Sequence, residues 1–236
     1  MDNFIQYATN IFPDFIKKIK GANDQEITKI EEIVKKAIGI PIPDYYKEFL
    51  KRLGHSNDQL ELIPEGGTTD ISDIIDYHEE IIQGIEVKTD DCITFGIGGI
   101  SSREIALVCS PKHGEPKVVE IDYNTIDQTL SESLEKFLFQ NFFPSECTKI
   151  YQKSRLYTIE SEYSLEDVAQ KIQNDFSVER QWFSDDLNFC GKNSNFGIYI
   201  DKVEMQIHVM FFYDKWSFSK ILEPCFKDLG TIINYD

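Results

Sequence analysis

The hydrophobic pattern of this chain changes period along its length, and that change limits the folds it can adopt. Apolar residues first repeat with helical spacing, and from residue 92 they form short runs separated by turn residues, which is typical of strands. After Pro144–Glu146 the pattern restarts with a strand, a helix and further strand-like runs. For 236 residues this predicts an α+β protein with two domains, at residues 1–146 and 147–236.

The helices expected in the first domain have recognisable starts and stops. The clearest apolar stripe has spacings i, i+3, i+4, i+7 and i+8 and consists of Ile30, Ile33, Val34, Ala37 and Ile38. Gly39 is expected to end this helix. A second helix should begin near Asp44 and end at Gly54, a third should follow Asp70 or Ser72 as its cap, and a less regular helix should span 4–19.

Short strands complete the first domain. They are expected at 60–64, 92–97, 105–109 and 117–122, with a turn at 110–114 and a closing helix that carries residues 134–142. In the second domain we expect a strand at 155–161, a helix at 164–176, strands at 181–190 and 196–213, a helix at 217–228 and a strand at 231–235. The run 196–213 is long for one strand and is expected to hide a turn at 201–202. This order predicts a smaller, ferredoxin-like α+β domain.

Aromatic residues gather in the second domain and should pack its core. In the run Val209–Tyr213 both faces of the expected strand carry apolar residues, so the second face needs a cover. The first domain, a second copy of the chain or a partner would each provide one, and we favour the first domain.

Charge excludes two classes of partner. The chain has 41 acids and 24 bases, a formal net charge of −17. Nucleic acids and anionic membranes are polyanions that select basic surfaces, so neither is expected to bind. An acidic surface favours a basic partner or simply keeps the protein in solution.

The cysteines and the N-terminal segment indicate the compartment. The five cysteines are odd in number, widely spaced and without a C-x-x-C pair, which suits reduced thiols better than disulfides or a zinc site. Residues 1–5 lack the cationic start of a signal peptide. No run approaches the roughly 18 apolar residues of a membrane-spanning helix. We therefore expect a cytoplasmic protein.

Several features occur in an order that resembles a known family. They are an acidic segment (Ile30–Glu32), an Ile-Gly pair (Ile38–Gly39), a proline before a Tyr-rich amphipathic helix (Ile42–Leu50), a glycine turn entering a β-meander (Phe95–Gly99) and a closing helix (Ser131–Leu138). This order resembles the SUKH superfamily, which includes fungal cell-wall-assembly regulators and bacterial immunity proteins. The likeness covers residues 24–142.

The resemblance implies a fold and a function for the first domain. The implied fold is an α+β domain with a mixed sheet and flanking helices, without catalytic residues or a cofactor. The implied function is that of an immunity protein, which binds and blocks a cognate toxin made by a neighbouring gene, often a nuclease. The alternative is a non-catalytic regulatory module for a housekeeping partner, such as one in cell-wall assembly.

The candidate binding residues come from one acidic stretch. Residues 58–91 contain eleven acids and one base, Lys88. Asp73, Asp76 and Glu80 have spacings that place them on one helix face. The candidate partner-binding residues are Asp70, Asp73, Asp76, Glu79, Glu80, Asp90 and Asp91. They would attract a cationic toxin, although an ordinary solvated helix face has the same pattern.

Other motifs do not indicate an enzyme. The segment Gly96–Ser101 begins like G-x-G-x-x-G but lies between expected strands, where no helix follows to bind a phosphate. The four histidines are far apart in sequence, and neither a nucleophile elbow nor a Walker A motif occurs. We therefore expect no catalytic residues, no cofactor and no metal.

Overall fold

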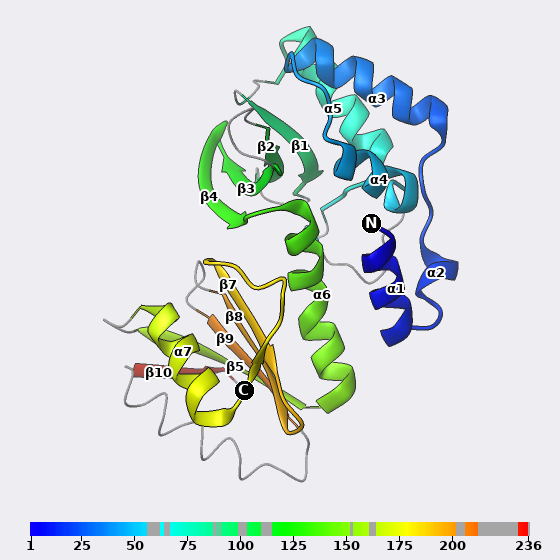
Figure 1. Ribbon diagram of the computed structural model, residues 1–236. Coiled ribbons are helices and arrows are strands. Elements are labelled where there is room, and N and C mark those ends of the chain that lie inside the picture. The colour runs from blue at the N-terminus through cyan, green and yellow to red at the C-terminus, as the bar shows by residue number, and fades with distance from the viewer. Residues whose placement is uncertain are drawn as a thin grey trace. The chain divides into compact units, whose positions relative to one another are not determined.

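The computed structural model describes residues 1–55, 62–63, 67–86, 89, 91–98, 103–109, 115–151, 153–160, 164–201, 206–211 and 231–235. The chain divides into two compact units, Met1–Leu138 and Phe139–Asp236. Within these residues it is a mixed α+β protein with antiparallel sheets (Figure 1). The predicted turn at 110–114 and helix at 217–228 lie outside the described residues, as does most of the predicted strand at 60–64.

The first unit begins with helices. Their bounds are α1 (Asp2–Ile11), α2 (Phe15–Lys18), α3 (Asp24–Ala37), α4 (Asp44–Leu53) and α5 (Ile71–Gln83). The predicted helix at 4–19 is wrong as one element, because Phe12 precedes a proline and is extended, which separates α1 from α2. Helix α3 starts earlier than its apolar stripe, at a capping box between Asn23 and Glu26. It ends as predicted before Gly39, whose φ is +92°.

The sheet of the first unit is a four-stranded meander in the order β1-β2-β3-β4. Its strands are β1 (Cys92–Ile97), β2 (Glu104–Val108), β3 (Lys117–Asp122) and β4 (Thr125–Ser131). The mixed sheet that we expected is wrong for the described strands, because all their pairings are antiparallel. Strands that follow one another through short connections pair antiparallel, whereas a parallel pair needs a long crossover.

The core of the first unit is built around Phe95 of β1. Its ring makes edge contacts with Tyr46 and Phe49 of α4, at centroid distances of 6.1 and 6.0 Å. It also meets Phe137, at 6.0 Å, and all four side chains are buried. The alternation of β1 therefore places one face against the helices and leaves the other for residues such as Cys92 and Thr94.

Helix α6 (Leu134–Tyr151) is longer than predicted and has Pro144 in its interior. The segment that we interpreted as a domain boundary is therefore helical, and the two units divide earlier, between Leu138 and Phe139. Proline removes one helical hydrogen bond. The helix nevertheless continues, because Phe143 before it and Cys147 after it are both buried.

The second unit contains a six-stranded antiparallel sheet in the order β10-β5-β9-β8-β7-β6. Its elements are β5 (Lys153–Glu160), α7 (Leu165–Phe176), β6 (Glu179–Arg180), β7 (Asn188–Lys192), β8 (Phe196–Asp201), β9 (Gln206–Phe211) and β10 (Thr231–Tyr235). The long run predicted at 196–213 is two antiparallel strands, β8 and β9, as the expected hidden turn implies.

Both faces of β8 are covered within the second unit. Phe196, Ile198 and Ile200 share a core cluster with Val168 and Ile172 of α7. On the other face a Cβ at Gly197 would lie 2.4 Å from Sγ of Cys147, so only glycine permits this approach of α6. This cover is the part of α6 that belongs to the second unit, while residues 212–213 of the run for which we favoured the first domain as cover lie outside the described residues.

Within the described part of the chain, no helix is both long enough and apolar enough to cross a membrane.

Candidate functional site

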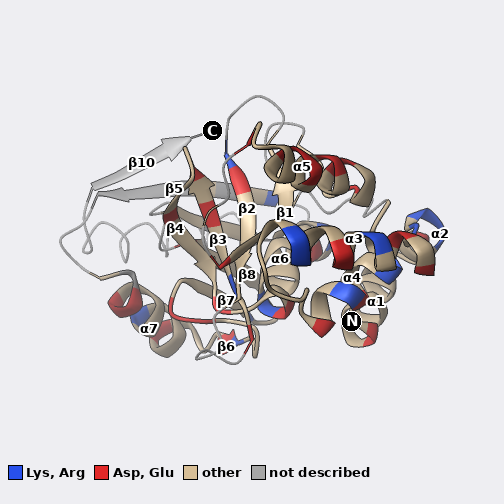
Figure 2. Cartoon of the chain, turned by 90° about the horizontal axis from the view of Figure 1, so that it is seen from above, with Lys and Arg blue, Asp and Glu red and all other residues tan. Residues whose placement is uncertain are grey.

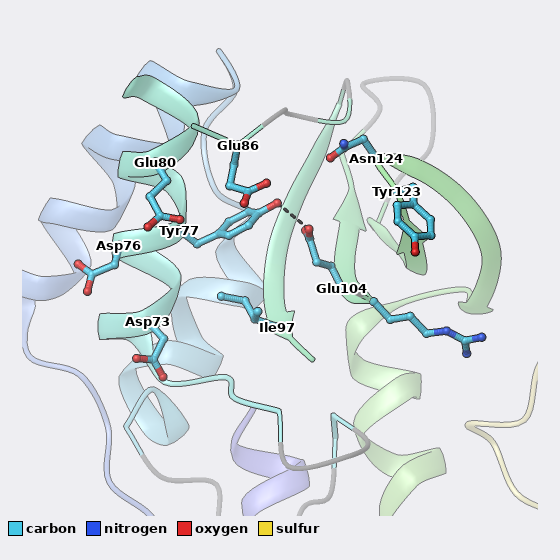
Figure 3. Close-up of a pocket in the computed structure, with 10 residues that line it drawn as sticks. Asp73, Asp76, Tyr77, Glu80, Glu86, Ile97, Glu104, Tyr123 and Asn124 are labelled. Atoms are coloured by element: carbon cyan, nitrogen blue, oxygen red, sulfur yellow. Dashed lines mark hydrogen bonds between the residues drawn. The ribbon is translucent and has the colours of Figure 1, made fainter. Parts of the chain in front are cut away.

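A groove in the first unit, with a volume of about 490 Å³, brings acidic residues together from several elements. We call it the acidic groove, and its lining residues are Asp73, Asp76, Tyr77, Glu80, Glu86, Ile97, Arg103, Glu104, Tyr123 and Asn124. The acids of α5 form one side, the turn between β3 and β4 lies opposite, and Glu104 lies between them (Figure 3). Five carboxylates and one guanidinium therefore share this groove.

Helix α5 forms one wall of the acidic groove because of where the helix begins and how its apolar residues are spaced. Asp70 is its N-cap and accepts a hydrogen bond from the backbone N–H of Ser72 at 2.9 Å. Ile71, Ile74 and Ile75 are buried, which turns the opposite face of the helix outward. Asp73, Asp76 and Glu80 lie on that outer face and line the groove, while Tyr77 lies between them.

The other predicted binding residues lie elsewhere. Asp70 is occupied as a helix cap and as a partner of His55. Glu79 forms an ion pair with Lys29 at 3.2 Å. Asp91 is exposed at a left-handed backbone position, with φ +60°, and does not line the groove. Asp90 lies outside the described residues.

Glu104 is the partly buried carboxylate of the groove. It accepts a hydrogen bond from the hydroxyl of Tyr77 at 2.6 Å and another from the hydroxyl of Thr94 at 3.0 Å. Burial raises the pKa of Glu104, and burial also raises the pKa of Tyr77, which therefore remains a donor. The pair links α5 to β2 across the groove, and its geometry depends on tertiary structure rather than on sequence spacing.

The positive charge of the groove is already engaged. Arg103 is its one base, and its guanidinium lies 3.0 Å from a carboxylate oxygen of Glu120. Within the described residues no ion pair involves Asp76, Glu80 or Glu86. A concave surface with one sign of charge concentrates the field of that charge, so this groove attracts cations.

The carboxylates are not arranged as a metal site. Among the described residues, no three His, Cys, Asp or Glu side chains are placed so that they could hold a metal ion together. What this arrangement can do is bind a larger cationic group through several separated carboxylates.

A second titratable cluster, around His55, has a structural role. Its Nε2 lies 3.0 Å from Glu26 and its Nδ1 lies 3.3 Å from Asp70. Glu26 belongs to the capping box of α3 and Asp70 caps α5, so His55 joins the N-termini of two helices. The hydrogen bond to Glu26 is the main cause that raises the pKa of His55. This cluster does not line the acidic groove.

Sequence reasoning missed most of the groove, since only Asp73, Asp76 and Glu80 of its lining residues were predicted. Glu104, Tyr77, Tyr123 and Asn124 were not predicted as site residues, and Glu86 was counted only as part of the acidic stretch. Glu104 carried one usable signal, since it is a lone acid at the start of an apolar strand. Tyr123 and Asn124 carried none, because β4 was not predicted and its turn was therefore unknown.

Comparisons of the chain with protein-family models, with curated proteins and with solved structures found no match. The likeness to the SUKH superfamily therefore stays a prediction from the motif residues.

Proposed function

We propose that this protein is an immunity-type binding protein that neutralises a cognate basic toxin by direct occlusion. The observation that carries the proposal is the acidic groove, where five carboxylates face one base that is already paired. Complementary charge of this kind raises the rate at which two proteins meet and fixes their orientation. The resemblance to SUKH immunity proteins points to the same function.

The proposal includes the fold of each unit. We assign the first unit to a SUKH-like fold and the second to a ferredoxin-like fold. Support for the second assignment comes from the strand order β10-β5-β9-β8, in which α7 follows β5 and the β8–β9 hairpin precedes β10. In this assignment β7 and β6 are an extension at one edge of the sheet.

We also propose that the protein has no catalytic activity and that it acts in the cytoplasm, where its toxin would act. Among the described cysteines, Cys109, Cys147 and Cys190 are free thiols, which suits a reducing compartment.

The first experiment tests neutralisation in cells. The chain is co-expressed with the toxic product of its neighbouring gene, and growth and gel filtration of the mixture are measured. We expect restored growth and a stable complex. Unrestored growth together with separate elution would overturn the proposal, and a complex with a non-toxic housekeeping protein would favour the regulatory alternative.

The second experiment tests the groove itself. Asp73→Asn, Asp76→Asn and Glu80→Gln, made together, should slow association about tenfold at low salt, with a smaller effect on dissociation. The matched control is Asp175→Asn, Asp186→Asn and Glu179→Gln, which removes the same charge from exposed positions of the second unit. Association of the unmodified protein should also slow as salt rises toward 0.15 M, where the screening length is about 8 Å. Equal rates for both triple variants would contradict a role for the groove.

A further inference from the structure

The hairpin between β3 and β4 carries an exposed aromatic residue where the backbone disfavours one. Asp122 pairs with Thr125, so Tyr123 and Asn124 form a two-residue turn, and both have positive φ, +46° and +63°. Turns of this kind favour Asn and Gly at both positions. Asn124 fits that preference, but a bulky side chain at positive φ is a genuine outlier.

The ring of Tyr123 contributes little to the core of the chain. It is 79% exposed, and Ile126, at the start of β4, is 46% exposed. A residue that adopts a strained backbone conformation and buries little of its side chain does not stabilise the folded chain. Its surroundings indicate another role, because Tyr123 lines the acidic groove across from α5 (Figure 3).

The charges around Tyr123 define what it could bind. The groove has a surplus of carboxylates, and its one base is bound to Glu120. An aromatic face attracts a cation that lies over it. Arginine suits such a site better than lysine, because its planar guanidinium stacks on a ring while its N–H groups donate to carboxylates in pairs.

We propose that Tyr123 anchors the partner in the acidic groove by stacking on an arginine side chain, whose guanidinium the groove carboxylates bind. This inference rests on the proposed function and makes it more specific, since it names the partner residue and the residue of this chain that holds it. Aromatic residues of this type dominate the energetics of protein interfaces.

The test uses a defined probe, the peptide acetyl-Arg-Arg-Arg-amide, titrated into the full chain and followed by two-dimensional NMR. We expect shifts of the amide signals of residues 123–124 and of α5. Tyr123→Asn should weaken binding about tenfold while the melting temperature stays the same or rises, because asparagine tolerates positive φ. Tyr123→Phe is the matched control, which keeps the ring and should bind like the unmodified chain. The trilysine peptide should bind several-fold more weakly.

The outcomes separate this inference from the proposed function. Tyr123→Asn could bind triarginine as tightly as the unmodified chain while the variant of Asp73, Asp76 and Glu80 loses binding. The role of Tyr123 as the anchor would then be wrong, and binding of basic groups by the acidic groove would stand. If the unmodified chain binds neither peptide, the basic-partner function and the anchor both fail. Equal binding of trilysine and triarginine would overturn the assignment of arginine.

Discussion

The two units of this protein differ in where their polar groups gather. The first unit has 26 acids and 14 bases, with acids along α5 (Figure 2), and five carboxylates line one groove. The second unit, with 15 acids and 10 bases, buries Gln140, Asp185 and Asn188 together. Those buried groups bond to one another, whereas acids of the groove such as Asp76 and Glu80 have no ion pair among the described residues.

This difference separates structural polar groups from those available to a partner. A buried polar group is stable only if its hydrogen bonds are made within the fold. Asp185 satisfies this rule, because it accepts from the side chain of Gln140 and from the backbone N–H groups of Leu187 and Asn188. Exposed carboxylates that repel one another in a groove give no such stability, which agrees with the binding role that we propose for them.

The substitution with the largest expected effect disrupts the apolar core of the first unit. Phe95→Ala should lower the free energy of unfolding by about 3–5 kcal/mol, because it removes a ring that contacts three other aromatic side chains. Both tryptophans, Trp182 and Trp216, belong to the second unit, so their fluorescence follows that unit while circular dichroism follows both. We expect the dichroism transition to move and the fluorescence transition to stay. Equal movement of both would show that the units unfold together, and Phe95→Leu is the milder control.

The substitution with the next largest expected effect disrupts the buried hydrogen-bond network of the second unit. Asp185→Ala should cost about 2–4 kcal/mol, because three donors lose their acceptor in a buried place. Tryptophan fluorescence during urea unfolding measures this change. Asp175→Ala removes an exposed acid that pairs with Lys171 at 3.0 Å and should cost less than about 0.5 kcal/mol. Similar losses for both variants would contradict the comparison between buried and exposed acids.

The smallest effect concerns pH and the first unit. The pKa of His55 is raised in the folded chain, so its contribution to stability is present below its unfolded pKa of about 6.5 and is lost as pH rises through the folded pKa. His55→Gln should therefore lower the free energy of unfolding by about 1–2 kcal/mol near pH 6 and by less near pH 9. The hydrogen bond from the backbone N–H of Asn23 lowers the pKa of Glu26, so the effect should shrink again only as pH falls through that lowered pKa and the carboxylate that faces His55 loses its charge. A loss that is the same at every pH would show that the imidazolium charge contributes nothing.

Much of the fold was predictable because its signals are local. Helix α4 follows from its apolar spacing and its flanking Pro43 and Gly54, and its predicted start and end are confirmed. Strand β4 was missed because most of its side chains are exposed or half-buried and few are apolar, so no alternation marks it. The continuation of α6 through Pro144 was missed because burial on both sides outweighs the local preference against proline.

The residues of the candidate site can also be divided into those that the sequence predicted and those that it did not. Asp73, Asp76 and Glu80 were named from helical spacing, and they do line the groove. Asp70 and Glu79 were named from the same charge pattern, but a helix cap and an ion pair engage them. The cap role of Asp70 was expected from the sequence, but its contact with His55 and the ion pair of Glu79 with Lys29 were not, because both partners come from other elements.

The sequence alone determined the α+β class, the excess of acid and the stretch that holds most of it, since periodicity and charge are read from neighbouring residues. Only the tertiary structure decided which acids meet. The groove exists because α5 contacts β1 and because β2 lies between β1 and β3, which brings Tyr77, Glu104 and Tyr123 together from distant positions. Such contacts depend on long-range strand pairing and packing, for which no local pattern carries a signal.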